Sequence, residues 1–204
     1  MLKNNLLDNI SINGGALCLD FVNTVHDRKN KPLRDYLSGF DDLVYWAKKL
    51  LLIDSGVFKM LQETATEKKQ NANLFFIEAI MLRELLHRIF KAVSEGKKVT
   101  SKDLDEFNNL LSSYFPFLKL KQQANSFNED WSLTSDNFYK ITAPIINSAY
   151  ELLLSDKLLK VKECPNCGWL FWDTTKNGKR RWCSMKNCGS NVKALEWYHR
   201  QKKK

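Results

Sequence analysis

Apolar residues recur every three or four positions between residues 74 and 94, the spacing that places side chains on one face of an α-helix. This apolar set comprises Leu74, Ile77, Met81, Leu82, Leu85, Ile89 and Val93. The polar residues that alternate with it predict a solvent-exposed face, and they are Arg83, Glu84, His87, Arg88 and Lys91. The segment therefore predicts a long amphipathic helix that packs on a core by one side.

Weaker helical patterns cover residues 41–53, 57–69 and 100–114, and Thr100 with Asp103 resembles a capping box at the start of the last. Residues 135–156 are strongly apolar and predict one more helix, which Pro144 must either begin or kink. We therefore expect a body of mostly α-helical structure that ends near Asp156.

Two segments depart from this helical pattern. Residues 116–132 have strand character, with a turn predicted over 125–130, and they indicate a small β-hairpin. Within residues 14–28, Leu17, Leu19 and Phe21 occupy alternate positions, but Leu17, Phe21, Val22 and Val25 also fit a helical face. Periodicity does not decide between strand and helix here.

The overall composition is that of a globular protein. Of the 204 residues, 44% are hydrophobic and 27% are charged. No apolar run approaches the roughly 18 residues that span a bilayer, and the N-terminus lacks a secretory signal. We expect a soluble, cytoplasmic protein without a membrane partner. In a reducing compartment, clustered cysteines indicate metal binding more than disulfides.

The positive charge is concentrated at the C-terminal end. Residues 160–204 hold twelve basic and three acidic side chains, which equals the net charge of +9 of the whole chain, whereas residues 1–159 are balanced. This asymmetry favours a polyanionic partner, nucleic acid first and an acidic membrane second. We divide the chain into a helical domain (1–157) and a basic module (158–204).

The basic module contains four cysteines with the spacing of a metal site, Cys164 and Cys167 followed by Cys183 and Cys188. Four thiolates enclose a tetrahedral Zn²⁺ and leave no position open for water, so we predict one structural zinc ion. Iron, a redox CxxC pair and four unliganded cysteines are the alternatives. Cys18 lies in an apolar run and is expected in the core.

Two basic clusters flank the predicted metal site. One is Lys179, Arg180 and Arg181, next to an expected hairpin turn at residues 177–178, and the other is Lys193, Arg200 and Lys204 on a predicted helix over 192–204. The apolar side of that helix is expected to cover the zinc site. The clusters either contact a phosphate backbone or form a solvated face. Four tryptophans either stack on unpaired bases or pack a small core, and they are Trp169, Trp172, Trp182 and Trp197.

A polar set near the N-terminus lies among apolar residues, and it comprises Asp20, Asn23, Thr24 and Arg28. These side chains either line a small-molecule pocket or cap the local backbone. The three histidines fall in unrelated segments, and no nucleophile–base spacing occurs. We therefore predict that the protein is not an enzyme.

The C-terminal module resembles the CGNR-type zinc finger of bacterial transcription regulators. The matching positions are Phe171, Asp173, Arg180, Arg181, Trp182, Cys183, Ser184, Met185, Cys188, Gly189 and Lys193. The stretch from Gly14-Gly15 to Asn23-Thr24, with its LDFVNT sequence, resembles the start of the ABATE domain that precedes this finger.

The resemblance implies a helical domain that senses a ligand and a zinc module that binds DNA. It favours the pocket interpretation of the N-terminal polar set. In this chain Ser190-Asn191 replaces the family's Asn-Arg, which removes the arginine suited to a guanine or phosphate contact. Asn191 can still read adenine, or Arg200 can replace the missing charge.

These observations predict a mostly α fold: a helical N-terminal domain with a small β-hairpin, plus a C-terminal ββα, treble-clef-like zinc module. We expect a DNA-binding transcription regulator with one structural zinc. An RNA-binding protein and a zinc-stapled adaptor for protein partners are the alternatives. One small finger makes few base contacts, so specific binding calls for a homodimer.

Overall fold

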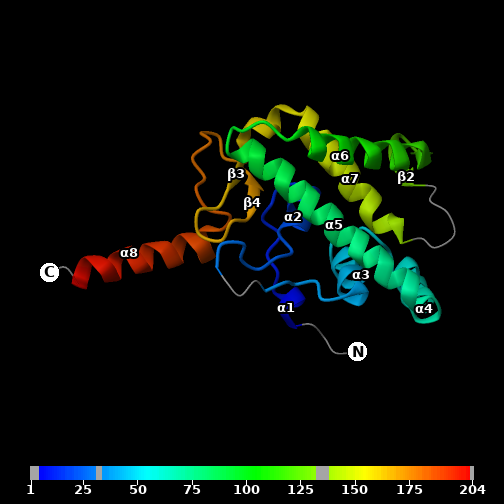
Figure 1. Cartoon of the computed structure of the whole chain (residues 1–204), viewed down its shortest axis with the longest axis horizontal. Helices are drawn as coiled ribbons and strands as arrows, with labels where there is room; N and C mark the ends of the chain where they lie inside the picture. Colours follow the sequence, from blue (N-terminus) through cyan, green and yellow to red (C-terminus); the bar gives the residue numbers. More distant parts are fainter. Residues whose placement is uncertain (1–4, 31–33, 132–137, 203–204) are drawn as a thin grey trace.

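The computed structural model describes residues 5–30, 34–131 and 138–202. Its N-terminal part is built mainly from helices (Figure 1). These helices are α1 (Asn5–Asp8), α2 (Leu17–Val22), α3 (Phe40–Lys49), α4 (Ser55–Glu67), α5 (Lys69–Ser94), α6 (Ser101–Tyr114) and α7 (Tyr139–Leu154), with short 3₁₀ turns at η1 (Phe115–Phe117) and η2 (Asp156–Lys160). The mostly α class predicted from the hydrophobic pattern is confirmed.

Helix α5 is the central element of the core. Its buried side packs against α2, α3 and α4, and its C-terminal half also contacts the strands of the zinc module. The short α2 is buried between α5 and α7. Its Phe21 ring lies 5.4 Å from the ring of Trp46, which belongs to α3. Residues 17–22, undecided between strand and helix, are therefore helical. Cys18 is fully buried in α2, as expected, and burial raises the pKa of its thiol to about 12.

The buried face of α5 overlaps only in part with the predicted one, since Leu82, Leu85 and Ile89 are buried as expected. Leu74, Ile77 and Met81 are each more than half exposed, whereas the polar Arg83 is only 3% exposed. Apolar residues form two neighbouring stripes on this helix, and the stripe that contains Phe75 packs against Phe40 of α3 and against Phe138. The helix period alone does not select between such stripes.

The helices predicted over 100–114 and 135–156 are present as α6 and α7, and some of their details differ from the prediction. Thr100 caps α6 by accepting a hydrogen bond from the backbone N–H of Asp103, as the capping box predicts. Pro144 lies inside α7 and does not begin it. The first residues of the predicted 135–156 helix fall outside the described part of the chain. His87, expected in solvent, is half-buried, and burial lowers its pKa to about 4.

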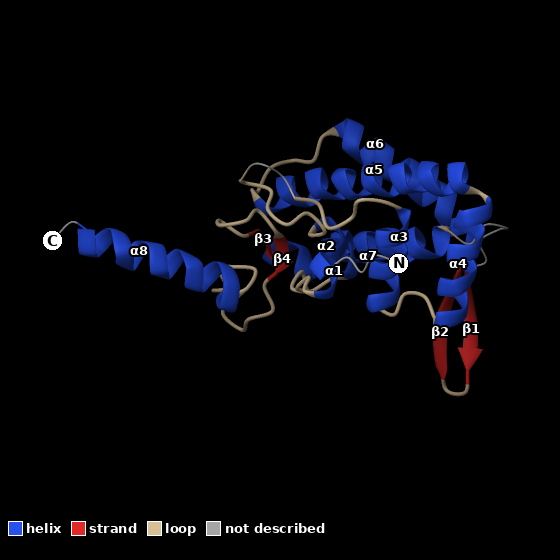
Figure 2. Ribbon diagram, turned by 90° about the horizontal axis from the view of Figure 1, so that it is seen from below, coloured by secondary structure: helices blue, strands red, loops and turns tan. Residues whose placement is uncertain are grey.

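A β-hairpin projects from the helical body (Figure 2). It pairs β1 (Leu118–Gln123) with β2 (Ser126–Trp131), and Gln123 faces Ser126 across a two-residue turn. The turn is tighter than predicted, because Ala124 adopts a φ of 48° and the residues assigned to the turn form β2.

The C-terminal module has the predicted ββα order. An antiparallel pair of β3 (Val161–Glu163) and β4 (Leu170–Trp172) precedes a π-helical turn, η3 (Met185–Gly189), and helix α8 (Ser190–Lys202). Helix α8 points away from the body (Figure 1), and none of its described side chains is buried. The expectation that its apolar side covers the zinc site is therefore wrong, because Leu195 and Tyr198 face solvent.

The turn expected at residues 177–178 is present, with Gly178 at a φ of 60°, but no strands flank it. The side chain of Lys162 lies inside this loop and donates hydrogen bonds to the carbonyl oxygens of Gly178 and Arg180. These bonds take the place of the hydrogen bonds that two paired strands would make in a hairpin. No helix within the described residues is both long and apolar enough to cross a bilayer.

Candidate metal centre and nucleic-acid interface

The first cysteine pair lies in the loop between β3 and β4. The backbone N–H of Cys164 donates to Trp169 O at 2.8 Å, and the N–H of Gly168 donates back to Cys164 O at 2.9 Å. Gly168, directly after the second cysteine, has a φ of 75°, a left-handed conformation that glycine adopts without a steric penalty. This tight loop turns both sulfurs toward the same point.

The second pair spans the turn into the last helix. Ser184 caps the π-helical turn by accepting from the N–H of Asn187, and Cys188 lies at the end of this turn, directly before α8. A Cβ on Gly189 would lie 2.6 Å from the sulfur of Met185, so this turn leaves little room for a side chain.

The four sulfur atoms form a compact, buried cluster. All lie within 4.8 Å of one another, and Cys183 Sγ lies 3.6 Å from the sulfurs of both Cys167 and Cys188. A tetrahedral zinc with bonds of about 2.3 Å separates its sulfurs by about 3.8 Å. The four side chains therefore fit one structural zinc ion, with Cys164, Cys167, Cys183 and Cys188 as its ligands.

An ion pair with a buried carboxylate organises the loop between the two cysteine pairs. Asp173 is fully buried, and its carboxylate accepts from Lys162 Nζ at 2.7 Å, from the Thr175 hydroxyl at 2.6 Å and from the N–H of Arg180 at 2.9 Å. Burial alone would raise the pKa of Asp173, but these donors hold it well below its usual range. The Lys162 ammonium is thus engaged within this loop, while its side chain remains 35% exposed.

Arg180, predicted as a nucleic-acid contact, is turned into the protein. Its guanidinium lies 4.5 Å from the Phe171 ring and donates to the carbonyl oxygens of Trp182, Cys183 and Asn13. The side chain is half-buried. These contacts tie the cysteine loop to the N-terminal segment and leave few donors for a partner.

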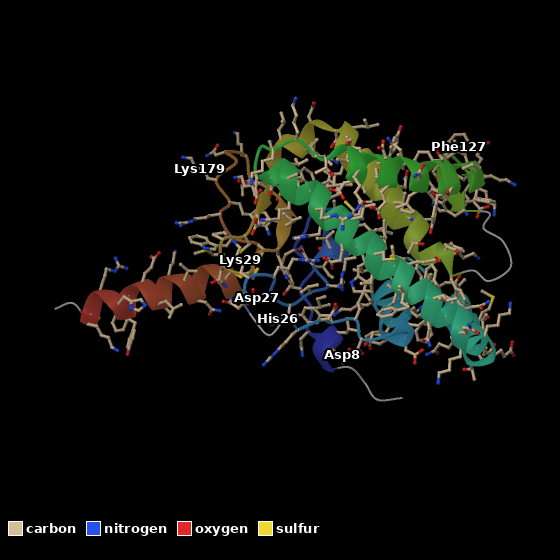
Figure 3. The ribbon with its side chains drawn as sticks, viewed as in Figure 1. Asp8, His26, Asp27, Lys29, Phe127 and Lys179 are labelled. Atoms are coloured by element: carbon tan, nitrogen blue, oxygen red, sulfur yellow. The ribbon has the colours of Figure 1, made fainter. Side chains whose placement is uncertain are left out.

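Four other basic side chains surround a surface hollow of about 670 Å³ beside the second cysteine pair, and they are Lys176, Lys179, Arg181 and Lys186. We call this surface the basic groove. Trp182 lines it, and the guanidinium of Arg181 lies 5.2 Å from the Trp182 ring. Figure 3 shows Lys179 on the outer loop of the module, pointing away from the body.

The remaining predicted nucleic-acid residues lie on α8. Asn191, Lys193 and Arg200 are all exposed, and Trp197 beside them is 60% exposed. Lys204 lies outside the described residues. By contrast Trp169 is buried, and Trp172 and Trp182 are half-buried, so most of these tryptophans pack the module as the core interpretation expects.

The N-terminal polar set contacts the zinc module and the local backbone. Asn23 Nδ2 donates to Leu170 O at 2.8 Å, and its Oδ1 accepts from Leu170 N at 2.9 Å. Asp20 Oδ1 accepts from Gly14 N at 2.7 Å, and Thr24 Oγ1 donates to Phe21 O. Arg28 pairs with Glu84 of α5 at 2.8 Å. These polar atoms are engaged inside the protein.

Backbone contacts extend this junction. The N–H of Trp172 donates to Gly14 O at 2.7 Å, and the Trp169 indole donates to Val25 O at 2.6 Å. The N–H of Arg28 donates to Cys167 O at 2.9 Å. Residues 13–28, which we call the docking segment, therefore run along the outer edge of β4 up to a zinc ligand.

Sequence reasoning missed a cluster of charges next to this segment. The buried Arg83 donates to Asp35 at 2.8 and 2.6 Å, to Glu84 at 2.9 Å and to Thr24 Oγ1 at 3.2 Å. Burial opposes ionisation of Glu84, but Arg28 and Arg83 lower its pKa to about 2. Helical periodicity placed Arg83 on a solvent face, and only its partners explain its burial.

The fold and site together define a helical protein that carries a C-terminal zinc finger with four cysteine ligands. Comparison with protein families agrees: the CGNR zinc finger matches residues 160–201, and ABATE, described as a "putative stress-induced transcription regulator", matches residues 15–156. The chain belongs to the ABATE family. No curated protein matches it.

Proposed function

We propose that this protein is a transcription regulator that binds duplex DNA through its zinc module. The observation that carries the proposal is the basic groove, which gathers four exposed cations on one surface of the module. Three of them lie on the loop that the Lys162–Asp173 ion pair stabilises, and Lys186 lies on the turn between Cys183 and Cys188. Cations gathered on one surface of the module can contact several phosphates of one nucleic-acid backbone.

Helix α8 supplies the second half of the proposed interface. It stands clear of the body and exposes Asn191, Lys193 and Arg200. A single helix fits the major groove, about 12 Å wide, where Asn191 would reach base edges. In this arrangement the basic groove would contact the phosphates and α8 would contact the bases. Sequence-selective binding needs both kinds of contact.

The test is fluorescence anisotropy of labelled random duplex DNA with zinc-loaded protein at several salt concentrations. We expect affinity to fall steeply with salt, by about 0.9 logarithmic units per phosphate contact for each tenfold rise. Lys179→Ala and Arg181→Ala should each weaken binding and reduce the slope by about one contact. Lys98→Ala, an exposed lysine of the helical body, is the matched control and should leave both unchanged. Absence of binding at low salt would refute the proposal.

The exposed apolar and aromatic side chains of α8 favour two other kinds of binding partner for the protein. Trp197 can stack on unpaired bases, and Leu195 and Tyr198 can contact a protein. Preference for single-stranded RNA that Trp197→Ala abolishes would favour an RNA-binding protein. A protein partner that survives nuclease treatment and is lost in Leu195→Asp would favour an adaptor.

We further propose that the helical domain senses a small ligand, that the protein acts as a homodimer in the cytoplasm, and that it has no catalytic role. The family description as a transcription regulator supports the proposal that the protein has no catalytic role. Two copies would double the few base contacts of one finger.

A further inference from the structure

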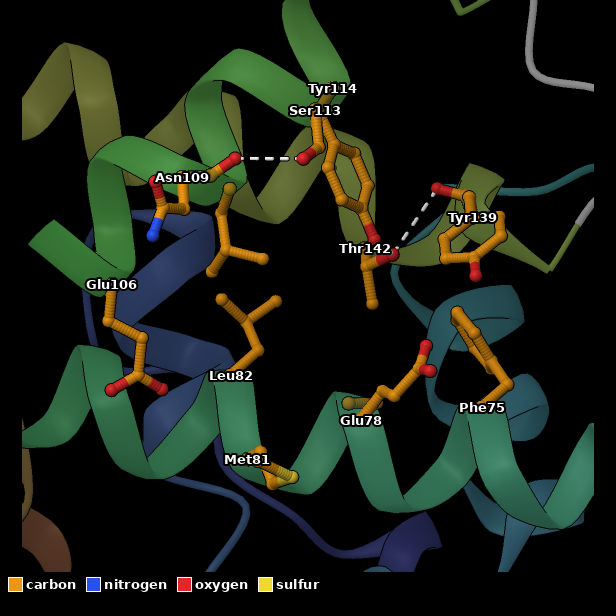
Figure 4. A pocket seen from close by; sticks show the side chains of 12 residues that line it. Phe75, Glu78, Met81, Leu82, Glu106, Asn109, Ser113, Tyr114, Tyr139 and Thr142 are labelled. Atoms are coloured by element: carbon orange, nitrogen blue, oxygen red, sulfur yellow. Dashed lines mark hydrogen bonds between the residues drawn. The ribbon is translucent and has the colours of Figure 1, made fainter.

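A cavity of about 380 Å³ opens between α5, α6 and α7 (Figure 4). Its lining is mainly apolar and aromatic, with Leu82 and Phe75 from α5, Tyr114 from α6 and Tyr139 from α7. A volume of this size accommodates a small organic molecule. None of the four residues predicted for a ligand pocket lines this cavity.

The aromatic rings of this cavity form a connected wall. The rings of Phe75 and Tyr139 meet edge to face at 5.2 Å, and those of Tyr114 and Tyr139 do so at 5.7 Å. The hydroxyl of Tyr114 lies 3.1 Å from Thr142 Oγ1, which fixes its ring. Burial raises the pKa of Tyr114, so this hydroxyl stays neutral. The wall is therefore preorganised before any ligand enters.

The charged residues that line the cavity are all acidic. Two carboxylates line it, Glu78 and Glu106, and no lysine or arginine does. Glu106 contacts Arg88 at 3.4 Å. Within the described part of the chain, no hydrogen bond or ion pair is made by Glu78, and Figure 4 shows its side chain directed from α5 into the cavity beside Phe75. Glu78 is an exposed residue, so its carboxylate is solvated at the rim of the cavity. An anionic ligand would meet repulsion here, whereas a cationic one would be attracted.

We propose that this cavity binds an organic cation with an apolar body, an amine or quaternary ammonium compound whose charge lies against Glu78. The aromatic wall adds cation–π attraction, worth about 0.5–2 kcal/mol in general, and covers the apolar part. This inference rests on the ligand-sensing part of the proposed function and not on DNA binding.

The cavity also has a direct mechanical connection to the metal module. Helix α5 lines the cavity from Phe75 to Leu82 and continues to Lys91, which binds Glu163 of β3 at 2.7 Å. Lys91 lies nine positions after Leu82, a rise of about 14 Å along the helix. A ligand that shifts α5 therefore acts on the strand that leads into Cys164.

The experiment is isothermal titration of the full-length, zinc-loaded protein with 4-phenylbutylamine and with 4-phenylbutanol. The two probes have almost the same shape, but only the amine is charged at neutral pH. We expect the amine to bind at least about tenfold more tightly. Glu78→Gln should remove this preference while leaving weak binding of both probes. Glu196→Gln, which changes an exposed glutamate on α8, should keep it.

A second variant tests the location without removing a buried group. Ser113 is an exposed residue of α6 at the edge of the cavity, and Ser113→Trp fills the space with an indole. This variant should keep the wild-type melting temperature and lose binding of both probes. Equal affinities for amine and alcohol, a preference that persists in Glu78→Gln, or absence of binding would overturn the proposal.

Two further measurements separate this inference from other outcomes. If light scattering reveals a dimer that Ser113→Trp dissociates, the cavity is a contact between copies and the cation proposal is wrong. DNA anisotropy on the same samples is read independently. Amine binding without DNA binding would refute the regulator and keep the cation site, and the reverse result would refute only the cation site.

Discussion

The side-chain amide of Asn23 pairs with both backbone polar groups of Leu170, donating to its O at 2.8 Å and accepting from its N–H at 2.9 Å. Leu170 begins β4, whose other edge pairs with β3. The side-chain amide of Asn23 thus makes the two hydrogen bonds that the backbone of a neighbouring strand would otherwise make to Leu170. It connects the ABATE segment to the zinc finger.

Replacement of Asn23 by alanine should destabilise the whole protein. It leaves the N–H and the C=O of Leu170 buried and unpaired, at a general cost of about 1–3 kcal/mol for each group. We expect a loss of about 2–4 kcal/mol in the free energy of unfolding, measured with urea on zinc-loaded protein. Asn71→Ala, at an exposed site of α5, is the control. A loss below about 0.5 kcal/mol would show that the pairing contributes little.

Gly14→Ala should also be strongly destabilising, for a steric reason. A Cβ at this position would lie 2.8 Å from Asp20 N and 2.9 Å from Leu19 C, and backbone atoms cannot yield cheaply. Gly39→Ala is the matched control, because nothing lies within 4 Å of its Cβ position. The melting temperature should fall by several degrees in the first variant, as expected for a loss of about 1 kcal/mol or more, and stay near wild type in the second. Equal melting temperatures would contradict this placement of Gly14.

Removal of zinc should loosen the helical body as well as the finger. Trp169, Leu170 and Phe171 belong to the same buried cluster as the core of α2 and α5. Chelation should therefore lower the melting temperature of the helical signal in circular dichroism. A helical transition unaffected by chelation would mean that the finger and the body are energetically separate.

The same experiment can be read by thiol alkylation and mass spectrometry. Zinc-loaded protein should react slowly, and chelated protein should gain four adducts. Cys18 should react only in denaturant, because it is fully buried and burial raises its pKa to about 12, where little thiolate exists. A fifth adduct under native conditions would contradict the position of Cys18 in the core.

Arg180 and Arg181 are neighbours with different expected roles. Arg180→Ala should lower stability by about 1–3 kcal/mol, since its donors bind carbonyl oxygens that would be left without partners. Arg181→Ala should leave the urea midpoint unchanged and reduce DNA affinity. If DNA affinity instead falls only in Arg180→Ala and only in proportion to unfolding, the basic groove does not bind DNA.

Asp20 should make stability depend on pH in mildly acid solution. Burial raises its pKa to about 6 in the folded protein from 3.8, so the folded state keeps a proton that the unfolded state has lost. Stability from this group is therefore greatest below about pH 4 and declines as the pH rises to about 6, by at most about 1.4 kcal/mol per unit.

Asp20→Asn removes this titration. The difference in unfolding free energy between wild type and variant should change across this pH window and be constant above it. Because only the slope is used, any constant effect of the amide on the Gly14 contact cancels. A difference that does not vary between about pH 4 and 6 would contradict the burial of this carboxylate.

The metal site could be predicted from the sequence because its determinants are local. Two residues separate Cys164 from Cys167, and Gly168 supplies the positive φ that closes the loop. The hydrophobic period likewise located α3, α5 and α6, since a helix satisfies its own backbone hydrogen bonds within a few residues. The cap at Thr100 is local in the same way.

Tertiary structure alone decided what these elements contact. Hydrophobic attraction has no direction, so an apolar stripe on α5 or α8 does not state whether anything covers it. Packing buried Phe75 and left Ile77 in solvent, and it left α8 without a covering partner among the described residues. Arg83 is buried because Asp35, 48 residues away, matches its charge.

The docking segment makes the same point for polar residues. Asn23, Asp20 and Arg28 suit a ligand pocket or a backbone cap equally well by composition. A hydrogen-bonding side chain takes whichever partner the fold brings to it, and for Asn23 that partner lies 147 residues away, at Leu170. The chain by itself determined the zinc ligands and most of the helices. Long-range packing decided which surfaces of this protein remain free to bind.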